Sequence, residues 1–256
     1  MYKYKYYFVF IVLIVVLLYL LLNSGKNYEN FQNKNNKYLK NDKLNSIHQK
    51  LKLKYGNFKS EYPEQVMIEK HILPDSQILE LGPNIGRSSL IANFKLRNKK
   101  KHLCVETNSD SVKKLKENRD LNNMEFQIFN GAISRKPLYQ KGWRCYDYPI
   151  KNSKKVNTKI MDEVKKKYNI DFDTIIADCE GCLISILKDE PNFLQQINLI
   201  ILEHDFNNKE ELEYFNELIK NNNFNLVDKI LKKDVGLLKW KDGILSDPIF
   251  VSVWKK

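Results

Sequence analysis

The chain has 256 residues, of which 43% are hydrophobic and 12% aromatic. This composition excludes an intrinsically disordered chain, because it supplies enough apolar surface for a core. The formal net charge is +12, which favours contact with anionic surfaces such as lipid or nucleic acid. Lysine is abundant along the whole chain, however, so charge alone does not indicate a nucleic-acid binder. The four cysteines are too few for a disulfide framework in a chain of this length.

The N-terminal segment Tyr6–Leu22 carries no charge and is almost wholly aliphatic or aromatic. As a helix it would span roughly 25 Å, at the short end for a bilayer core. A cleaved signal peptide is the alternative, but its apolar region is usually shorter and no small-x-small cleavage site follows. We therefore expect residues 1–25 to be a single-pass anchor in the lipid bilayer. Two lysines precede the segment and four follow it before residue 41, so the positive-inside rule favours a cytosolic C-terminal domain.

Residues 26–58 are rich in asparagine and lysine and are expected to form a linker. Within this stretch Leu44, Ile47, Leu51 and Tyr55 recur at helical spacing among lysines. This pattern predicts an amphipathic helix with two alternative positions, either on the lipid surface or packed on the globular domain. The remaining residues, 59–256, suit one domain with a full core.

Strand and helix patterns alternate regularly after residue 59. Short apolar runs predict strands at Gln77–Leu81, His102–Glu106, Phe126–Phe129, Thr174–Asp178, Leu199–Glu203, Asn225–Lys229 and Ile249–Trp254. Helices are expected at about 63–73, from 86, and at 109–119, Asp162–Lys167, 181–188 and Glu210–Asn221. Such alternation predicts an α/β domain with a mostly parallel sheet that helices cover on both faces.

The segment Ile78–Ser89 runs from strand through a tight turn into a helix. Gly82 lets the chain turn sharply, and Gly86 is expected to let the backbone approach a ligand. The spacing differs from the Gly-x-Gly-x-x-Gly of dinucleotide binders and from phosphate-binding loops. S-adenosylmethionine carries a cationic sulfonium and an ammonium, which favour a nearby carboxylate such as Glu80. The alternative is an ordinary turn between a strand and a helix.

A second carboxylate, Glu106, ends the next predicted strand. At this position a carboxylate can accept hydrogen bonds from both hydroxyls of a ribose. It follows Gly86 by 20 residues, the offset expected for such a role. A carboxylate at the end of a strand is commonly just exposed to solvent, with no ligand. The prediction for Glu106 therefore depends on its occurring together with the glycine turn.

Two further strands end in polar residues. Asp178 and Glu180 follow the strand from Thr174, at the carboxyl edge where ligands bind in open α/β sheets, so they are expected to face the cofactor's methyl group and the acceptor. Glu180 has the alternative role of capping the next helix. His204 follows the strand from Leu199 and is a candidate general base because its usual pKa lies near neutrality.

Cys179 and Cys182 form a C-x-x-C pattern, as in redox proteins. The neighbouring Asp178 and Glu180 should raise the thiol pKa values and so oppose a reactive thiolate. A zinc site would need two more ligands, and the sequence has no second C-x-x-C. We therefore expect neither a redox role nor a metal at this position.

These segments together resemble the FkbM family of S-adenosylmethionine-dependent methyltransferases. Asn84 lies in the Asn-Ile-Gly part of the family's glycine motif, and Val105–Asn108 resembles its Val-Glu-Pro-Asn with Thr107 in place of proline. Ile176–Gly181 resembles the Asp-x-Glu-Gly signature. The segment Asn130–Ser134, which includes Gly131 and Ala132, resembles the adenine-side segment.

The resemblance covers about residues 63–206 and implies a Rossmann-like class I methyltransferase fold, with seven strands and a reversed final strand. It also implies methyl transfer to an oxygen, often on a sugar or a small metabolite, and makes Glu180 a candidate base. Asp178 is then expected to orient the acceptor or the methionine end of the cofactor. The stretch Arg135–Val156 has no clear counterpart in the family. It is expected either to shape the acceptor pocket or to form a surface insertion.

Two other functions compete with the O-methyltransferase. Methyltransferases that act on amino groups of nucleic-acid bases often have an Asp/Asn-Pro-Pro-aromatic run after the fourth strand. Here that position reads Asp178-Cys-Glu-Gly181, which argues against a nucleic-acid acceptor. A membrane-tethered binding module without catalysis is the other alternative. The presence of Glu80, Gly82, Gly86 and Glu106 disfavours it.

Overall fold

The computed structural model describes residues 41–235 and 247–256. The predicted anchor, Tyr6–Leu22, lies outside the described residues, as do residues 26–40 of the predicted linker. Within the described ranges no helix is both long enough and apolar enough to cross a membrane.

Within residues 41–235 and 247–256, seven strands form the main sheet, in the spatial order β11-β12-β10-β9-β1-β2-β3. All neighbouring pairs are parallel except those of β12, which runs antiparallel to both β10 and β11. The bounds are β1 Ile78–Leu81, β2 His102–Glu106, β3 Gln127–Asn130, β9 Thr174–Ala177, β10 Leu199–Glu203, β11 Asn225–Leu231 and β12 Ile249–Lys255. This mostly parallel sheet with one reversed strand confirms the predicted Rossmann-like fold class.

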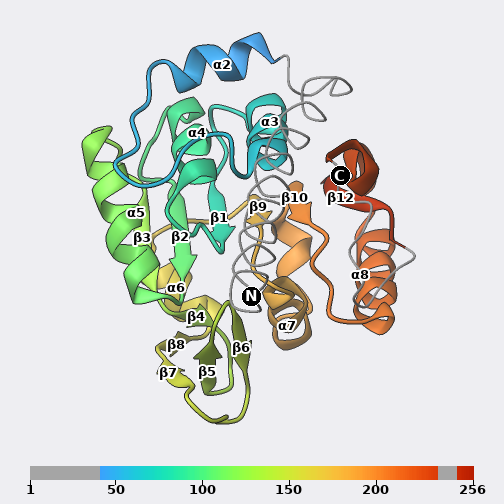
Figure 1. Cartoon of the computed structure of the whole chain (residues 1–256). Coiled ribbons are helices and arrows are strands. Elements are labelled where there is room, and N and C mark those ends of the chain that lie inside the picture. The colour runs from blue at the N-terminus through green and yellow to red at the C-terminus, as the bar shows by residue number, and fades with distance from the viewer. Residues whose placement is uncertain (1–40, 236–246) are drawn as a thin grey trace, which may run out of the picture.

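Helices cover both faces of the sheet, as the alternating pattern predicts (Figure 1). The central strands β1 and β9 are buried along their whole length, because helices cover both faces of the sheet. Alternate residues divide between two cores: Leu79 lies in one core and Ile78 in the other. The core that contains Ile78 includes residues from α3 (Tyr62–His71), α4 (Arg87–Lys95) and α5 (Ser109–Leu121). The core that contains Leu79 includes residues from α6 (Met161–Tyr168), α7 (Cys182–Asp189) and α8 (Lys209–Asn221).

The sheet changes its winding direction between β1 and β9. From β1 the chain builds outward through β2 and β3, and it then returns to place β9 on the other side of β1. Ligands of open α/β sheets bind outside the carboxyl ends of the strands at such a switch point. The candidate residues that end β1, β2, β9 and β10 therefore lie along one edge.

The amphipathic segment before the domain packs on the core rather than standing apart from it. The helix α2 (Asp42–His48) is shorter than the predicted pattern, and Leu44 is fully buried. Leu51 is also buried, and the chain beyond it is held by side chains of α5. Asn118 Oδ1 accepts from the backbone N–H of Lys54 at 2.8 Å. Of the two alternatives, the structure shows packing on the domain, which includes residues from 41 onward.

The stretch without a family counterpart, Arg135–Val156, forms a separate antiparallel ribbon (Figure 1). Its strands are β5 (Leu138–Lys141), β6 (Arg144–Tyr146) and β7 (Lys154–Val156), in the order β6-β5-β7. A short pair, β4 (Ala132–Ile133) with β8 (Thr158–Lys159), connects the ribbon to the domain.

Candidate functional site

The turn after β1 depends on two glycines for reasons of backbone geometry. Gly82 has φ 77°, and a Cβ there would collide with the backbone oxygen of Asp178 at the end of β9. Gly86 has φ 93° and begins α4, and a Cβ there would lie 2.5 Å from Leu115 Cδ1. The sequence analysis assigned Gly86 to close approach of a ligand. The structure instead gives positive φ and packing against α5 as the reasons for glycine.

Glu106 is buried at the end of β2 and holds the turn in place. Its two carboxylate oxygens accept from different backbone N–H groups, that of Asn84 at 3.0 Å and that of Asn108 at 2.8 Å. Burial raises the pKa of Glu106 while these backbone donors lower it, and burial is the larger effect. Each oxygen retains acceptor capacity, because a carboxylate oxygen has two lone pairs. Glu106 is thus placed to accept two hydroxyl donors.

The predicted adenine-side residues lie directly beside Glu106. Asn130 Nδ2 donates to the backbone oxygen of Glu106 at 2.9 Å, and the N–H of Gly131 donates to the same oxygen at 2.9 Å. Ala132 follows at the start of β4, where its N–H donates to Asn157. These contacts join the ends of β2 and β3. They place Asn84, Glu106 and Asn130–Ala132 in one continuous region.

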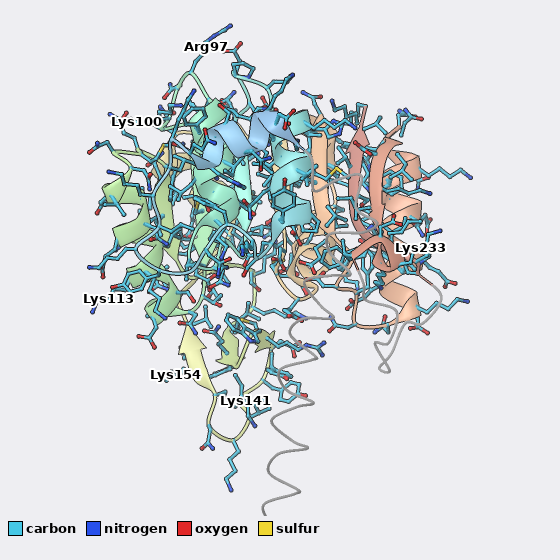
Figure 2. The ribbon with its side chains drawn as sticks, turned by 45° about the horizontal axis from the view of Figure 1, so that its top comes forward. Arg97, Lys100, Lys113, Lys141, Lys154 and Lys233 are labelled. Atoms are coloured by element: carbon cyan, nitrogen blue, oxygen red, sulfur yellow. A yellow bond between two sulfur atoms is a disulfide. The ribbon has the colours of Figure 1, made fainter. Side chains whose placement is uncertain are left out.

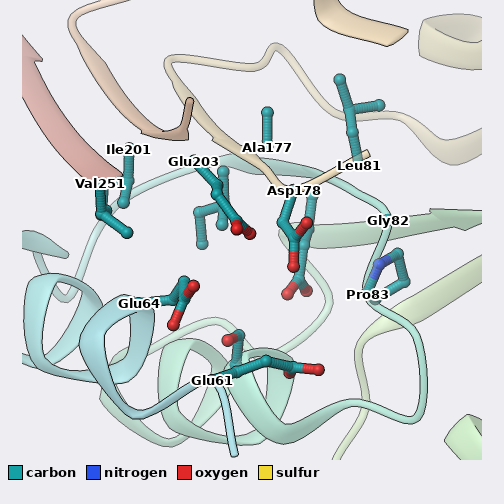
Figure 3. Close-up of a pocket in the computed structure, with 13 residues that line it drawn as sticks. Glu61, Glu64, Leu81, Gly82, Pro83, Ala177, Asp178, Ile201, Glu203 and Val251 are labelled. Atoms are coloured by element: carbon teal, nitrogen blue, oxygen red, sulfur yellow. The ribbon is translucent and has the colours of Figure 1, made fainter. Parts of the chain in front are cut away.

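A pocket lined by five carboxylates adjoins this region (Figure 3). Its acidic residues come from the start of α3 and from the ends of three neighbouring strands: Glu61, Glu64, Glu80, Asp178 and Glu203. Gly82 and Pro83 also line it, so the pocket begins at the glycine turn. The apolar part of its wall is formed by Leu81, Ile176, Ala177, Ile201 and Val251.

Two of the five carboxylates contact a basic or thiol side chain. Glu61 forms an ion pair with Arg87 at 2.6 Å. Glu80 Oε2 lies 2.8 Å from His102 Nε2 and accepts from Cys104 Sγ at 3.2 Å. The sequence analysis placed Glu80 near the cationic part of the cofactor. The structure shows that Glu80 lines the pocket and also links β1 to β2.

The other three carboxylates, Glu64, Asp178 and Glu203, have no ion pair with a lysine, arginine or histidine in the described part of the chain. Glu64 is 5% exposed, and its Oε2 atom is buried without a hydrogen-bond partner among the described residues. In Figure 3 the side chains of all three point into the same space. The pocket therefore gathers acidic groups that no lysine, arginine or histidine of the described residues pairs with.

Burial and mutual repulsion raise the pKa values of Glu64, Asp178 and Glu203. Burial is the larger cause and raises the pKa of Glu64 to about 8, with repulsion from Asp178 adding to it. Burial and the neighbouring carboxylates also raise the pKa of Asp178 and, more strongly, that of Glu203. Two adjacent carboxylates of this kind share a proton more readily than they both ionise. The pair Asp178 and Glu203 can therefore accept or release a proton near neutral pH.

One other group of side chains has metal-ligand spacing. Among the described residues, only Glu80, His102 and Cys104 bring three metal-binding atoms within 4.8 Å of one another. All three side chains are buried and contact each other directly. Burial and the adjacent Glu80 raise the pKa of the Cys104 thiol, which opposes the thiolate that a metal needs. We interpret the trio as a hydrogen-bonded link between strands.

His204 does not fit the role of general base that its sequence position suggested. The residue is 9% exposed, and both of its ring nitrogens have partners. Nδ1 lies 2.5 Å from Asp247 Oδ2, and Nε2 lies 2.7 Å from Ser252 Oγ. The return of β12 beside β10 brings Ser252 to this position. His204 therefore joins the two strands and does not line the pocket.

The loop after β9 presents Glu180 outside the pocket. Glu180 has φ 55° and lies 3.7 Å from Arg144 of the β5–β7 ribbon. Cys179 and Cys182 are joined by a disulfide, which the sequence had not indicated. The short loop before α7 places their Cα atoms 5.4 Å apart, within disulfide range. The sequence analysis also missed Asp205, whose carboxylate accepts from the N–H of Cys179 at 3.1 Å.

No protein-family model matches the chain, and no curated protein matches it in sequence. The resemblance to the FkbM family therefore stays a prediction. The solved structures that it is similar to include a ribosomal protein L11 methylase from Lactobacillus delbrueckii subsp. bulgaricus, with 13% identity and a TM-score of 0.48. That likeness covers 80% of this chain and 81% of the other.

Two further likenesses are of the same kind. A precorrin-6y C5,15-methyltransferase from Geobacter metallireducens has 13% identity and a TM-score of 0.44, covering 75% of this chain and 88% of that one. A candidate tRNA methyltransferase from Streptococcus pneumoniae, solved with S-adenosylmethionine, has 11% identity and a TM-score of 0.43, covering 75% and 71%. At TM-scores below 0.5 these likenesses carry no functional conclusion, so we infer function from the site itself.

Proposed function

We propose that this chain is an S-adenosylmethionine-dependent methyltransferase that methylates a hydroxyl of a sugar or another small molecule. The observation that carries the proposal is the continuous path along one sheet edge from Glu106 to the carboxylate pocket. Glu106 offers two acceptor oxygens for ribose hydroxyls, and the pocket beyond Gly82 is negative. This order of polar groups suits a cofactor with a ribose at one end and positive charge at the other.

The described residues fit this cofactor along its length. Asn130, Gly131 and Ala132 would border the adenine, and Glu106 would hold the ribose with Asn84 beside it. Gly82 and Asp178 would border the methionine end, where Glu80 adds negative charge. When bound, S-adenosylmethionine supplies a methyl group activated by a cationic sulfur. The turn in Ile78–Ser89 lacks the glycine pattern of a phosphate-binding loop. This agrees with a cofactor that carries no phosphate.

The protein must then orient the acceptor and remove a proton from its hydroxyl. Asp178 is the base that we propose, since it lines the pocket and burial raises its pKa toward neutrality. Glu180 lies at the exposed end of the same loop, beside Arg144, and is proposed to contact the acceptor. His204 is left out of the reaction, because both of its ring nitrogens are engaged.

The distribution of positive charge supports a small acceptor over a nucleic acid. Figure 2 shows Arg97, Lys100, Lys113, Lys141, Lys154 and Lys233 on different sides of the molecule. Nucleic-acid binding proteins usually gather such residues into one patch or stripe. The pocket itself is acidic and would repel a phosphate backbone.

We also propose that residues 1–25 anchor the chain in a membrane, with the catalytic domain in the cytosol. The uncharged run Tyr6–Leu22 and the lysines that follow it support this proposal. Full-length protein should stay in the membrane pellet after carbonate washing, and protease protection should report the orientation. Release of the full-length chain into the supernatant would contradict the anchor.

Calorimetry tests the cofactor directly. Full-length protein in detergent should bind S-adenosylmethionine, whereas NAD should give no saturable heat. Binding of NAD with no response to S-adenosylmethionine would overturn the proposed function. A chain that binds the cofactor but transfers no methyl group to any acceptor would instead be a binding module without catalysis.

A further inference from the structure

The carboxylate pocket extends past the position of the cofactor toward the far side of the sheet. The proposed ribose and adenine contacts lie at the ends of β2 and β3, and the methionine end lies over β1 and β9. Glu203 ends the next strand, β10, and Glu64 projects from α3 toward it (Figure 3). Val251 of β12 closes the same pocket. With the cofactor in the proposed position, Glu64 and Glu203 would lie on the side of its methyl group from which the acceptor enters.

The acidic side chains in this part of the pocket favour a cation, because a bound positive charge stabilises the ionised form of a buried carboxylate. One S-adenosylmethionine carries a net charge of about +1, whereas Glu64, Asp178 and Glu203 are three acids without an ion-pair partner in the described ranges. The orphaned Oε2 of Glu64 is the most costly of these groups, because a buried acceptor without a donor loses its hydration and gains nothing. A ligand with positive charge and several N–H donors would satisfy it.

The spacing and the walls of the pocket favour an organic cation over a metal ion. Glu64, Asp178 and Glu203 are not among the side chains whose ligand atoms lie within 4.8 Å of one another in the described structure. A metal ion needs such close ligands, whereas an ammonium group contacts acceptors from about 2.8 Å on each side. The apolar side chains of Ile176, Ile201 and Val251 border the carboxylates and would contact a carbon skeleton.

We propose that this pocket binds a protonated amine of the acceptor, so that the substrate is an amino alcohol or an amino sugar. The inference rests on the proposed function and narrows its substrate class. The ammonium group lies against Glu64 and Glu203, and the hydroxyl that receives the methyl group lies nearer to Asp178. Glu64 and Glu203 are then binding residues that fix the orientation of the acceptor.

The test is calorimetry on full-length protein in detergent at pH 7, with S-adenosylhomocysteine present. The probes are ethanolamine, which is protonated at this pH, ethylene glycol as its neutral counterpart, and Mg²⁺. Ethanolamine should bind saturably and ethylene glycol should not. Glu64→Gln, which keeps the shape of the side chain, should weaken ethanolamine binding about ten- to a hundredfold. The exposed Glu125→Gln is the matched control and should bind ethanolamine like the unaltered chain.

Three results would overturn the inference. The first is equal binding of ethanolamine and ethylene glycol, or no binding of either. The second is saturable Mg²⁺ binding that depends on Glu64 while ethanolamine fails to bind. The third comes from a parallel titration without S-adenosylhomocysteine: ethanolamine binding that occurs only in its absence would assign the pocket to the cofactor's own ammonium group.

A parallel titration with S-adenosylmethionine separates this inference from the proposed function. Cofactor binding that is retained in Glu64→Gln, together with failure of the ethanolamine arm, would overturn the substrate class alone. Absence of cofactor binding in the unaltered chain would overturn the proposed function instead. Thermal unfolding of each variant verifies that Glu64→Gln is folded, and Glu203→Gln provides a second variant of the same pocket.

Discussion

Glu106 and the carboxylate pocket lie near the same edge of the main sheet and differ in what their carboxylates contact. Glu106 is buried at the end of β2, and both of its oxygens already accept backbone hydrogen bonds. Glu64, Asp178 and Glu203 line the pocket without a cationic partner in the described part of the chain, and one oxygen of Glu64 has no partner of any kind.

The region around Glu106 is preorganised for its ligand, whereas the carboxylate pocket is completed only when its ligand binds. The backbone donors hold Glu106 in position before any ligand arrives, so a ribose would meet acceptors that need not move. In the pocket, burial and repulsion disfavour the ionised carboxylates until a cation binds. We therefore expect substitutions in the first region to affect cofactor binding, and substitutions in the second to affect stability and acceptor binding.

The largest effect should come from the glycine turn that joins the two regions. Gly82→Ala places a Cβ against the backbone oxygen of Asp178 in addition to the strain of positive φ. It should lower the free energy of unfolding by about 3 kcal/mol or more, as for other strongly disruptive substitutions. Gly142→Ala is the matched control, because Gly142 has φ 62° but nothing within 4 Å of its Cβ position. Its cost should be about 1 kcal/mol, and equal losses in denaturant unfolding would contradict the clash.

Glu106→Ala should give the next largest effect, on cofactor affinity. Removing charge-assisted acceptors costs about 1.5–3 kcal/mol, which is about a ten- to a hundredfold loss in affinity for S-adenosylmethionine. Glu64→Gln should leave that affinity nearly unchanged, since Glu64 lies on the acceptor side of the pocket. Calorimetry on the two variants measures both values. A larger loss in Glu64→Gln than in Glu106→Ala would reverse the assignment of the two regions.

The unpaired pocket should also make the ligand-free protein sensitive to pH. The folded pKa of Glu64, about 8, lies above its ordinary value of 4.5, so the folded state holds the proton through this window while the unfolded chain releases it. Stability from this group is therefore present below about pH 4.5 and lost as pH rises toward 8. Asp178 and Glu203 face Glu64 and are shifted in the same direction.

Glu64→Gln should remove part of this dependence. The fall in unfolding free energy between pH 5 and pH 8 should be smaller in the variant by about 1 kcal/mol or more, because one pKa unit corresponds to about 1.4 kcal/mol. Denaturant unfolding at the two pH values measures the difference, with Glu125→Gln as the control. Identical pH profiles for the unaltered chain and Glu64→Gln would show that the pocket does not repel charge in the folded state.

The smallest effect should come from the contact between the ribbon and the loop after β9. Arg144 and Glu180 are both substantially exposed and lie 3.7 Å apart, so their ion pair contributes little to stability. Arg144→Ala should change the unfolding free energy by less than about 0.5 kcal/mol. A loss above about 1 kcal/mol in thermal or denaturant unfolding would show that the ribbon is part of the domain's core rather than an exposed arm.

The fold and the region around Glu106 could be predicted because their signals are local. The strands β2 and β10 have the predicted bounds, since each is a short apolar run that ends in a polar residue. Gly82, Gly86 and Glu106 belong to consecutive elements, so their spacing along the chain carried the prediction. The reasons for glycine at position 86, in contrast, are its positive φ and the packing of Leu115, which only the structure shows.

The carboxylate pocket could not be predicted, because its parts come from distant elements. Glu64 lies on α3 and Glu203 on β10, and only the packing of the helix over the sheet brings them together. The same holds for His204, whose partners Asp247 and Ser252 arrive with the reversed strand β12. The positions of the acidic residues along the chain do not indicate which of them are buried side by side in the tertiary structure.

Methyl transfer itself tests the central claim most directly. Full-length protein is incubated with methyl-labelled S-adenosylmethionine and a cell extract, which is then separated into small-molecule, glycan and nucleic-acid fractions for mass spectrometry. The unaltered chain should place the label on a hydroxyl in the small-molecule or glycan fraction. Asp178→Asn should reduce this transfer about a hundred- to ten-thousandfold, as expected for loss of a general base. Label found only in nucleic acid, or in no fraction despite cofactor binding, would contradict the account.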